Sequence, residues 1–215
     1  MKYNTIIFDL DGTLLNTLED LADAVNYALK ESGYPLRTTD EVRRFIGNGV
    51  KKLMERSTPD NITDGDFEKC YQLFREYYKN NSRNKTAPFE GITDLLKKLK
   101  EQGIKTAVVT NKMDEAAQDV IRYYFGELID ITIGQRDGIP TKPDPACVNK
   151  AIESLNAEKE SCIFIGDSDV DILAGHNAGL PAIGVTWGYR SKELLLESGA
   201  DYIAESPFEI LEFIK

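Results

Sequence analysis

The chain has 215 residues, of which 26 are basic and 36 acidic, so its formal net charge is −10 and its sequence pI is about 4.8. This length can bury a sizeable core and allows one domain or two. The acidic balance repels phosphate backbones, so we expect no nucleic-acid partner, and no apolar run approaches the roughly 20 residues of a membrane span.

The cysteines and the N-terminal sequence bear on the compartment. Cys70, Cys147 and Cys162 are scattered and show no metal-ligand spacing, which predicts reduced, partly buried thiols. The N-terminal sequence lacks the basic region, apolar run and cleavage site of a secretion signal. We therefore expect a cytoplasmic protein without a membrane partner.

The first predicted element is a buried strand over residues 5–8, and acidic residues follow it directly as Asp9-Leu10-Asp11-Gly12-Thr13. Residues two apart in an extended chain face the same side, so Asp9 and Asp11 can address one ligand, and Gly12 can turn the chain with a positive φ. Two ionised carboxylates repel each other unless a cation lies between them. The pair therefore predicts a hard metal such as Mg²⁺, a nucleophile beside an acid/base, or both, although an ordinary helix-capping turn has the same pattern.

Residues 18–79 show helical periodicity and no convincing strand, which predicts a small helical bundle inserted after the first strand. We expect this cap domain to span residues 15–85 and the core to comprise residues 1–14 and 86–215. The expected hinges are Leu14–Thr17 and the polar segment Asn80–Pro88. An inserted bundle of this kind is typical of a lid that closes over a ligand.

From residue 88 onward, short apolar strands alternate with helices. We expect strands at 105–109, 129–133, 162–165, 182–185 and around 202–203, and helices at 92–100, 114–125, 145–155 and 172–178. This alternation predicts an α/β fold with a doubly wound parallel sheet that helices cover on both sides. Ligands of such sheets bind beyond the carboxyl ends of the strands.

Polar residues follow the later strands at that same edge. Thr110-Asn111-Lys112 comes after the strand at 105–109, and Gly166-Asp167-Ser168-Asp169-Val170-Asp171 comes after the strand at 162–165. Lys142 lies between prolines in a stiff segment that leads into a helix. Taken singly, Thr110 is most simply a helix cap and Lys142 a surface lysine. The loop Trp187-Gly188-Tyr189 is most simply a packed loop, with substrate-side packing as the alternative.

In this order, Asp9-x-Asp11-Gly12-Thr13, Thr110, Lys142 and Gly166-Asp167-x-x-x-Asp171 resemble the four signature motifs of the haloacid dehalogenase superfamily, specifically its phosphatases. The match covers essentially the whole chain. Residues 45–50, Phe-Ile-Gly-Asn-Gly-Val, and Thr110-Asn111-Lys112 further resemble the phosphoglycolate phosphatase branch, which carries a helical cap. The resemblance implies a Rossmann-like core and a Mg²⁺-dependent phosphomonoester hydrolase.

The resemblance also implies the roles of the acidic residues. Asp9 would be the nucleophile that forms an aspartyl-phosphate, and Asp11 would protonate the leaving oxygen and then deprotonate water. Mg²⁺ would be bound by Asp9, by the main-chain carbonyl of Asp11 and by Asp167. Asp171 would support the metal waters or orient Lys142. Thr110 and Lys142 would hold the transferring phosphoryl group.

The expected substrate is 2-phosphoglycolate or a similar small phosphorylated metabolite, bound by a monomer or a homodimer. The residues that we expect to contact it are Gly12, Asn48, Lys51, Asn111 and Lys112. A sugar-phosphate mutase of the β-phosphoglucomutase type and a pyrophosphatase of the same superfamily are alternatives. A phospho-receiver signalling domain is an alternative of another class, but the position of Asp9 on the first strand and the inserted helices argue against it.

Overall fold

The computed structural model describes residues 2–215, and its internal contacts divide the chain into two compact units. The larger unit combines the N-terminal segment up to Leu15 with Pro88–Lys215, and the smaller unit is Asn16–Ala87. The expected boundaries, after residues 14 and 85, differ from this division by one and two residues.

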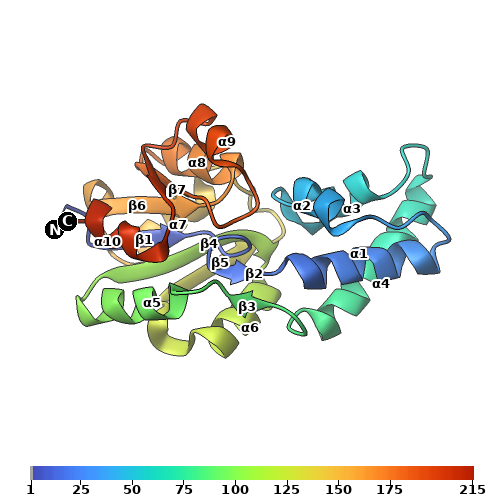
Figure 1. Ribbon diagram of the computed structural model, residues 1–215, viewed down its shortest axis with the longest axis horizontal. Coiled ribbons are helices and arrows are strands. Elements are labelled where there is room, and N and C mark those ends of the chain that lie inside the picture. Colours follow the sequence, from blue (N-terminus) through green and yellow to red (C-terminus); the bar gives the residue numbers. More distant parts are fainter. Residues whose placement is uncertain (1) are drawn as a thin grey trace. The chain divides into compact units, whose positions relative to one another are not determined.

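The larger unit is built on a six-stranded parallel sheet with the strand order β5-β4-β1-β6-β7-β8 (Figure 1). From β1 the chain adds β4 and then β5 on one side, and later β6, β7 and β8 on the other. The direction of strand addition therefore reverses beside β1, which is where doubly wound sheets bind ligands. The strands are β1 Thr5–Phe8, β4 Lys105–Met113, β5 Ile131–Gln135, β6 Cys162–Gly166, β7 Ala182–Val185 and β8 Tyr202–Ala204.

Helices cover both faces of this sheet because successive strand residues point to opposite sides. Ile6 and Phe8 pack with residues of α5, α6 and α10, whereas Ile7 packs with residues of α7 and α8. The predicted α/β fold with a doubly wound sheet is confirmed. The helices of this unit are α5 Ile92–Glu101, α6 Asp114–Tyr124, α7 Ala146–Ser154, α8 Asp169–Asn177, α9 Lys192–Glu197 and α10 Ile210–Phe213, with the short 3₁₀ helices η1 Gly126–Leu128, η2 Lys159–Ser161 and η3 Pro207–Glu209.

Strand β4 is longer than predicted. The apolar run ends at Val109, but the strand continues to Met113 and its register against β5 shifts between these two residues. Thr110-Asn111-Lys112 therefore belongs to the strand, and all three side chains are buried. A polar stretch that is buried at a strand end carries no apolar signal, so the prediction stopped too early.

The smaller unit consists of four helices, which agrees with the helical bundle expected from the sequence. Helix α1 packs mainly against α4, and their buried positions recur every four residues, for example Leu21 and Val25 on α1 and Phe74 and Tyr78 on α4. The rings of Tyr27 and Tyr77 stack across this contact at a centroid distance of 4.4 Å. The helices are α1 Leu18–Glu31, α2 Thr39–Phe45, α3 Gly49–Ser57 and α4 Asp64–Asn81.

The two linkers between the units pair as short strands, β2 Leu15–Asn16 and β3 Ala87–Pro88, which are too short to show a sequence pattern. The buried carboxylate of Asp20 on α1 accepts hydrogen bonds from the backbone N–H groups of Lys85 and Thr86, at 2.9–3.1 Å. This carboxylate ties the residues just before β3 to the first helix of the smaller unit.

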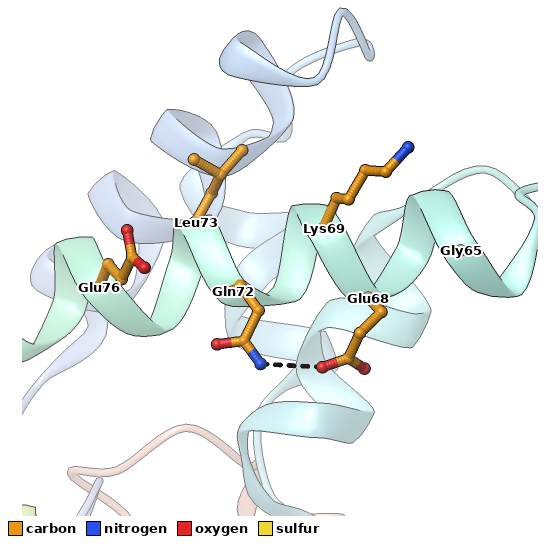
Figure 2. Close-up of a pocket in the computed structure, with 6 residues that line it drawn as sticks. All are labelled: Gly65, Glu68, Lys69, Gln72, Leu73 and Glu76. Atoms are coloured by element: carbon orange, nitrogen blue, oxygen red, sulfur yellow. Dashed lines mark hydrogen bonds between the residues drawn. The ribbon is translucent and has the colours of Figure 1, made fainter.

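Among residues 2–215, no helix combines the length and the apolar character needed to cross a membrane. A shallow pocket of about 590 Å³ runs along one side of α4 (Figure 2). Its lining, which includes a Gln72–Glu68 hydrogen bond of 2.9 Å, contains none of the predicted site residues.

Candidate active site

The carboxyl ends of β1, β4 and β6 gather the predicted motifs of the larger unit at one edge of the sheet. Asp9 follows β1 directly, and its backbone N–H donates to the Ile165 carbonyl of β6 at 2.8 Å. Asp167 follows β6, and Asp171 lies in the first turn of α8. All three carboxylates are buried, and each offers an oxygen within 4.8 Å of the others.

Lys142 lies between two of these carboxylates. Its ammonium donates to Asp9 Oδ1 at 2.5 Å and to Asp171 Oδ1 at 2.7 Å, and its side chain is 3% exposed. Asn111 holds the Lys142 backbone from both sides, because its Oδ1 accepts from the Lys142 N–H at 2.8 Å and its Nδ2 donates to the Lys142 carbonyl at 3.2 Å. Asn111 thus positions Lys142, and its predicted contact with substrate stays a prediction.

Asp171 is fixed through its second oxygen. Asp171 Oδ2 accepts hydrogen bonds from the Ser168 hydroxyl at 2.6 Å and from the Ser168 backbone N–H at 3.1 Å, which forms the capping box that starts α8. Gly166 has no room for a side chain, since a Cβ there would collide with Asp171. Asp171 therefore links the start of α8 to Lys142.

Asp167 has only neutral hydrogen-bond donors among its described partners. Its Oδ1 accepts from the Thr13 hydroxyl at 3.2 Å, and its Oδ2 accepts from the Tyr189 backbone N–H at 2.8 Å. Gly12 turns the chain beside it with a φ of 97°, and a Cβ on Gly12 would collide with the Asp167 carboxylate. The glycine of the first motif is thus required for the backbone conformation and for space.

Asp11 forms an ion pair with Lys112, whose Nζ lies 3.0 Å from Asp11 Oδ1. The Lys112 side chain is 3% exposed and that of Asp11 is 16% exposed, so the lysine is buried and the carboxylate is partly accessible. The Thr110 hydroxyl oxygen accepts from the Lys112 backbone N–H at 3.2 Å, which leaves its own proton able to donate. Lys112 thus orients Asp11 through its side chain and Thr110 through its backbone.

The electrostatics of the site favour an additional cation. Burial, reinforced by the charge of Asp171, raises the pKa of Asp9 well above its usual range and that of Asp167 to about 7. Burial opposes the charged form of Lys142, but the carboxylates of Asp171 and Asp9 outweigh it and raise the pKa of its ammonium. With all six groups in their ionised forms, the carboxylates of Asp9, Asp11, Asp167 and Asp171 exceed the ammonium groups of Lys112 and Lys142 by two negative charges.

This donor set fits Mg²⁺. The nearby ligands are carboxylate oxygens, which hard divalent cations prefer, and the excess of two negative charges matches the charge of one such ion. Both oxygens of Asp171 are engaged, Oδ1 by the Lys142 ammonium and Oδ2 by Ser168. Among the described contacts, Lys142 engages only Oδ1 of Asp9, and Asp167 has no ammonium within ion-pair distance. Asp9 and Asp167 are therefore the better side-chain candidates for holding the metal, and Asp171 is better placed to orient Lys142.

The predicted cap contacts lie in the smaller unit. Asn48 is exposed at the start of α3, between two glycines with positive φ, and its Oδ1 accepts from Arg56 Nη2 at 2.8 Å. Arg56 also donates to the Phe45 carbonyl at 2.7 Å. Lys51 is exposed on the first turn of α3. Sequence reasoning missed Arg56, because its partner is eight residues away and the spacing shows no regular pattern.

Sequence reasoning also missed the supporting residues Thr13, Ser168 and Tyr189. Thr13 belongs to the first motif, and the Ser168-x-x-Asp171 spacing is that of a capping box, so both had a usable signal. Tyr189 acts through its backbone, which no side-chain pattern reveals. The loop Trp187-Gly188-Tyr189, expected to be simply packed, touches Asp167 directly.

Comparisons with known proteins agree with this arrangement. Residues 6–185 match the family model of haloacid dehalogenase-like hydrolases. A phosphoglycolate phosphatase of Aquifex aeolicus is 36% identical over 214 residues, covering 97% of this chain and 99% of the relative. A Caldanaerobacter subterraneus protein, to which pyrophosphatase activity is ascribed, is 32% identical over 217 residues, covering 100% of this chain and 96% of the relative.

Solved structures show the same likeness. A Lactobacillus delbrueckii protein, to which phosphoglycolate phosphatase activity is ascribed, superposes with a TM-score of 0.94 at 33% identity, covering 100% of this chain and 99% of that one. The family model spans most of the chain, and the relatives exceed 30% identity over nearly all of it. The chain therefore belongs to the haloacid dehalogenase-like hydrolases and is an enzyme of their phosphatase group.

Proposed function

We propose that this protein is a Mg²⁺-dependent phosphomonoesterase that works through an aspartyl-phosphate on Asp9, and that its substrate is 2-phosphoglycolate or a similarly small phosphorylated carboxylate. The observation that supports this most is the arrangement around Asp9. A buried carboxylate at a strand end, with a lysine in contact and a second carboxylate two residues on, combines a nucleophile, a phosphoryl-binding charge and an acid/base in one place.

The reaction would run in two displacements. In the first, a carboxylate oxygen of Asp9 attacks phosphorus, the bond from phosphorus to the leaving oxygen breaks, and Asp11 gives that oxygen its proton. In the second, Asp11 takes a proton from water, the water oxygen bonds to phosphorus, and the bond to Asp9 breaks. Phosphate leaves, and both aspartates return to their starting states.

Lysine and threonine would hold the phosphoryl group between these steps. The Lys142 ammonium adds positive charge beside Asp9, and the Thr110 hydroxyl can donate to a phosphoryl oxygen, which stabilises charge in the transition state. Mg²⁺, held by Asp9, Asp167 and the main-chain carbonyl of Asp11, would neutralise phosphoryl charge when bound. Asn111 and Asp171 keep Lys142 in place by the contacts described above.

The proposed substrate rests on the named relatives and on the chemistry of two segments. Phosphoglycolate carries a carboxylate at the end opposite its phosphate, so a second group of hydrogen-bond donors or cations must bind that carboxylate. Asn48 and Lys51 on one short segment of the smaller unit are candidates, with Lys112 as a candidate of the larger unit. The Caldanaerobacter relative supports pyrophosphate as a second candidate substrate, because the leaving group in its hydrolysis, orthophosphate, is a small anion like the glycolate that phosphoglycolate would release.

Phosphate release from a panel of monoesters and from pyrophosphate tests the proposal. We expect many turnovers per chain on 2-phosphoglycolate, loss of activity on chelation, and recovery with Mg²⁺. Asn48→Ala and Lys51→Ala should each lower kcat/KM for phosphoglycolate about ten- to a hundredfold and affect an aryl phosphate much less. A preference for pyrophosphate or a hexose phosphate would overturn the substrate assignment, and undiminished hydrolysis without a divalent cation would overturn the role of the metal.

A further inference from the structure

The segment Thr186–Arg190, which we name the 186–190 loop, follows β7 and reaches the Asp167 carboxylate from two directions. The Tyr189 backbone N–H donates to Asp167 Oδ2 at 2.8 Å. The Trp187 indole Nε1 donates to the Thr13 carbonyl at 3.0 Å, and the Thr13 hydroxyl donates to Asp167 Oδ1 at 3.2 Å. Both oxygens of this carboxylate are therefore oriented by contacts in which the loop takes part.

The loop also packs directly against Asp167. A Cβ on Gly188 would collide with the Cβ of Asp167 and with the Gly12 carbonyl. Gly188 does not need glycine for its φ, so the requirement there is space alone. Two glycine backbones, at positions 12 and 188, thus confine the same side chain.

The loop itself is anchored to the sheet. The Thr186 N–H donates to the Ala204 carbonyl of β8 at 3.1 Å, and the Trp187 ring packs against the apolar core that α5, α6 and α10 share with the sheet. The 186–190 loop is therefore held in place at Thr186 and at Trp187, and neither contact depends on a mobile surface side chain. A loop anchored in this way can fix the orientation of the Asp167 side chain beside it.

These contacts orient Asp167 without neutralising it. Each oxygen accepts one hydrogen bond from a neutral donor and keeps lone-pair capacity, and Arg190 adds only a weaker electrostatic attraction. Asp171 differs, because an ammonium touches it directly. A buried carboxylate that is fixed in direction but that no cation contacts among residues 2–215 has the features of a metal ligand held ready for its ion.

We propose that the 186–190 loop is a positioning element for the divalent cation, with Gly188 and Trp187 setting the orientation in which Asp167 meets the metal. This inference rests on the metal requirement within the proposed function. It goes further by assigning a role in metal affinity to residues that no signature motif contains. Neither Gly188 nor Trp187 is expected to touch the metal or the substrate.

Metal binding without substrate tests this role. Mg²⁺ affinity is measured by isothermal titration calorimetry, and Mn²⁺ binding by electron paramagnetic resonance, for the wild type, Gly188→Ala and Trp187→Phe. Gly188→Ala should raise the Kd about ten- to a hundredfold, because the added Cβ would displace Asp167 and disturbed outer-shell partners of a metal ligand typically cost this much. Trp187→Phe keeps a ring but loses the N–H donor, so it should raise the Kd about two- to tenfold.

Gly65→Ala is the matched control, because a Cβ there meets no atom within 4 Å and Gly65 has no positive φ. It lies in the first turn of α4 (Figure 2) and should bind Mg²⁺ as the wild type does. Saturating Mg²⁺ should restore kcat in both loop variants, which a general loss of folding would not allow. If Gly188→Ala does not fold, Trp187→Phe carries the test.

Wild-type Mg²⁺ and Mn²⁺ affinity in the loop variants would overturn the positioning role while leaving the phosphatase assay unaffected. Absence of metal binding by the wild type itself would overturn both this inference and the metal requirement of the proposed function. Loss of activity that no Mg²⁺ concentration restores, at unchanged Kd, would assign the loop to catalysis and reject its role toward the metal.

Discussion

Replacing Lys142 by methionine should destabilise the protein strongly in the absence of metal. Methionine has a similar length, so the substitution removes mainly the charge. The ammonium is 3% exposed and contacts two buried carboxylates, Asp9 and Asp171, which would lose their shared counter-charge. Breaking a buried ion pair by removing one partner typically costs about 3 to 5 kcal/mol, because the remaining charge stays buried and unpaired.

Urea unfolding in the presence of a chelator measures this cost, with fluorescence of Trp187, the single tryptophan, as the probe of the larger unit. Lys150→Met is the matched control, because Lys150 pairs with Glu153 at 2.8 Å on the exposed surface. Adding Asp171→Asn to Lys142→Met should recover part of the stability, since one buried charge is then gone. The reasoning is refuted if Lys142→Met costs no more than Lys150→Met, or if Asp171→Asn adds a further full loss.

Three other expectations follow from the same contacts. Burial raises the pKa of Asp167 to about 7 in the metal-free folded protein, well above the value near 4 of an exposed carboxyl, so between these pH values the folded state holds a proton that the unfolded state releases. The free energy of unfolding should therefore fall as pH rises from about 4 to 7, and Asp167→Asn should flatten this slope in urea titrations. An unchanged slope would contradict the raised pKa. Lys112→Met should lower kcat/KM for an alkyl phosphate by about tenfold or more and for an aryl phosphate much less, because Lys112 orients Asp11 and only a poor leaving group needs the proton of Asp11. Equal losses on both substrates would count against this role. Asp20→Ala should cost about 1 to 3 kcal/mol and speed hydrogen exchange of the Lys85 and Thr86 amides that it leaves without their acceptor, while Asp23→Ala, which removes an exposed partner of Lys85, should leave that exchange unchanged.

The parallel sheet and its acidic edge could be predicted because the signal is local. Asp9 and Asp167 each follow an uninterrupted apolar strand, and parallel strands bring their carboxyl ends to one edge of the sheet. The helical insertion was predictable for the same reason, since its apolar residues recur with a helical period. These are properties of a few consecutive residues, and they need no knowledge of distant contacts.

The supporting contacts could not be predicted, because they join residues far apart in the chain through groups with no sequence pattern. Trp187 reaches a carbonyl 174 positions away, and Tyr189 acts through a backbone N–H. Asn111 has an amide side chain that suits ligand binding, but its hydrogen bonds are made with the Lys142 backbone. In each case burial and backbone geometry decide what the residue does, and the residue type alone indicates neither.

The phosphoryl acceptor is the most direct test of the central claim. An aryl phosphate needs little help from an acid to leave, whereas hydrolysis of the aspartyl-phosphate needs the base, so Asp11→Asn should accumulate the intermediate. The variant is incubated with the aryl phosphate and Mg²⁺, quenched in acid and mapped by peptide mass spectrometry. The account predicts one phosphoryl group on Asp9, absent from an Asp9→Asn/Asp11→Asn control. A phosphoryl group on another residue, or an Asp9→Asn protein that turns over at near wild-type rate, would contradict it.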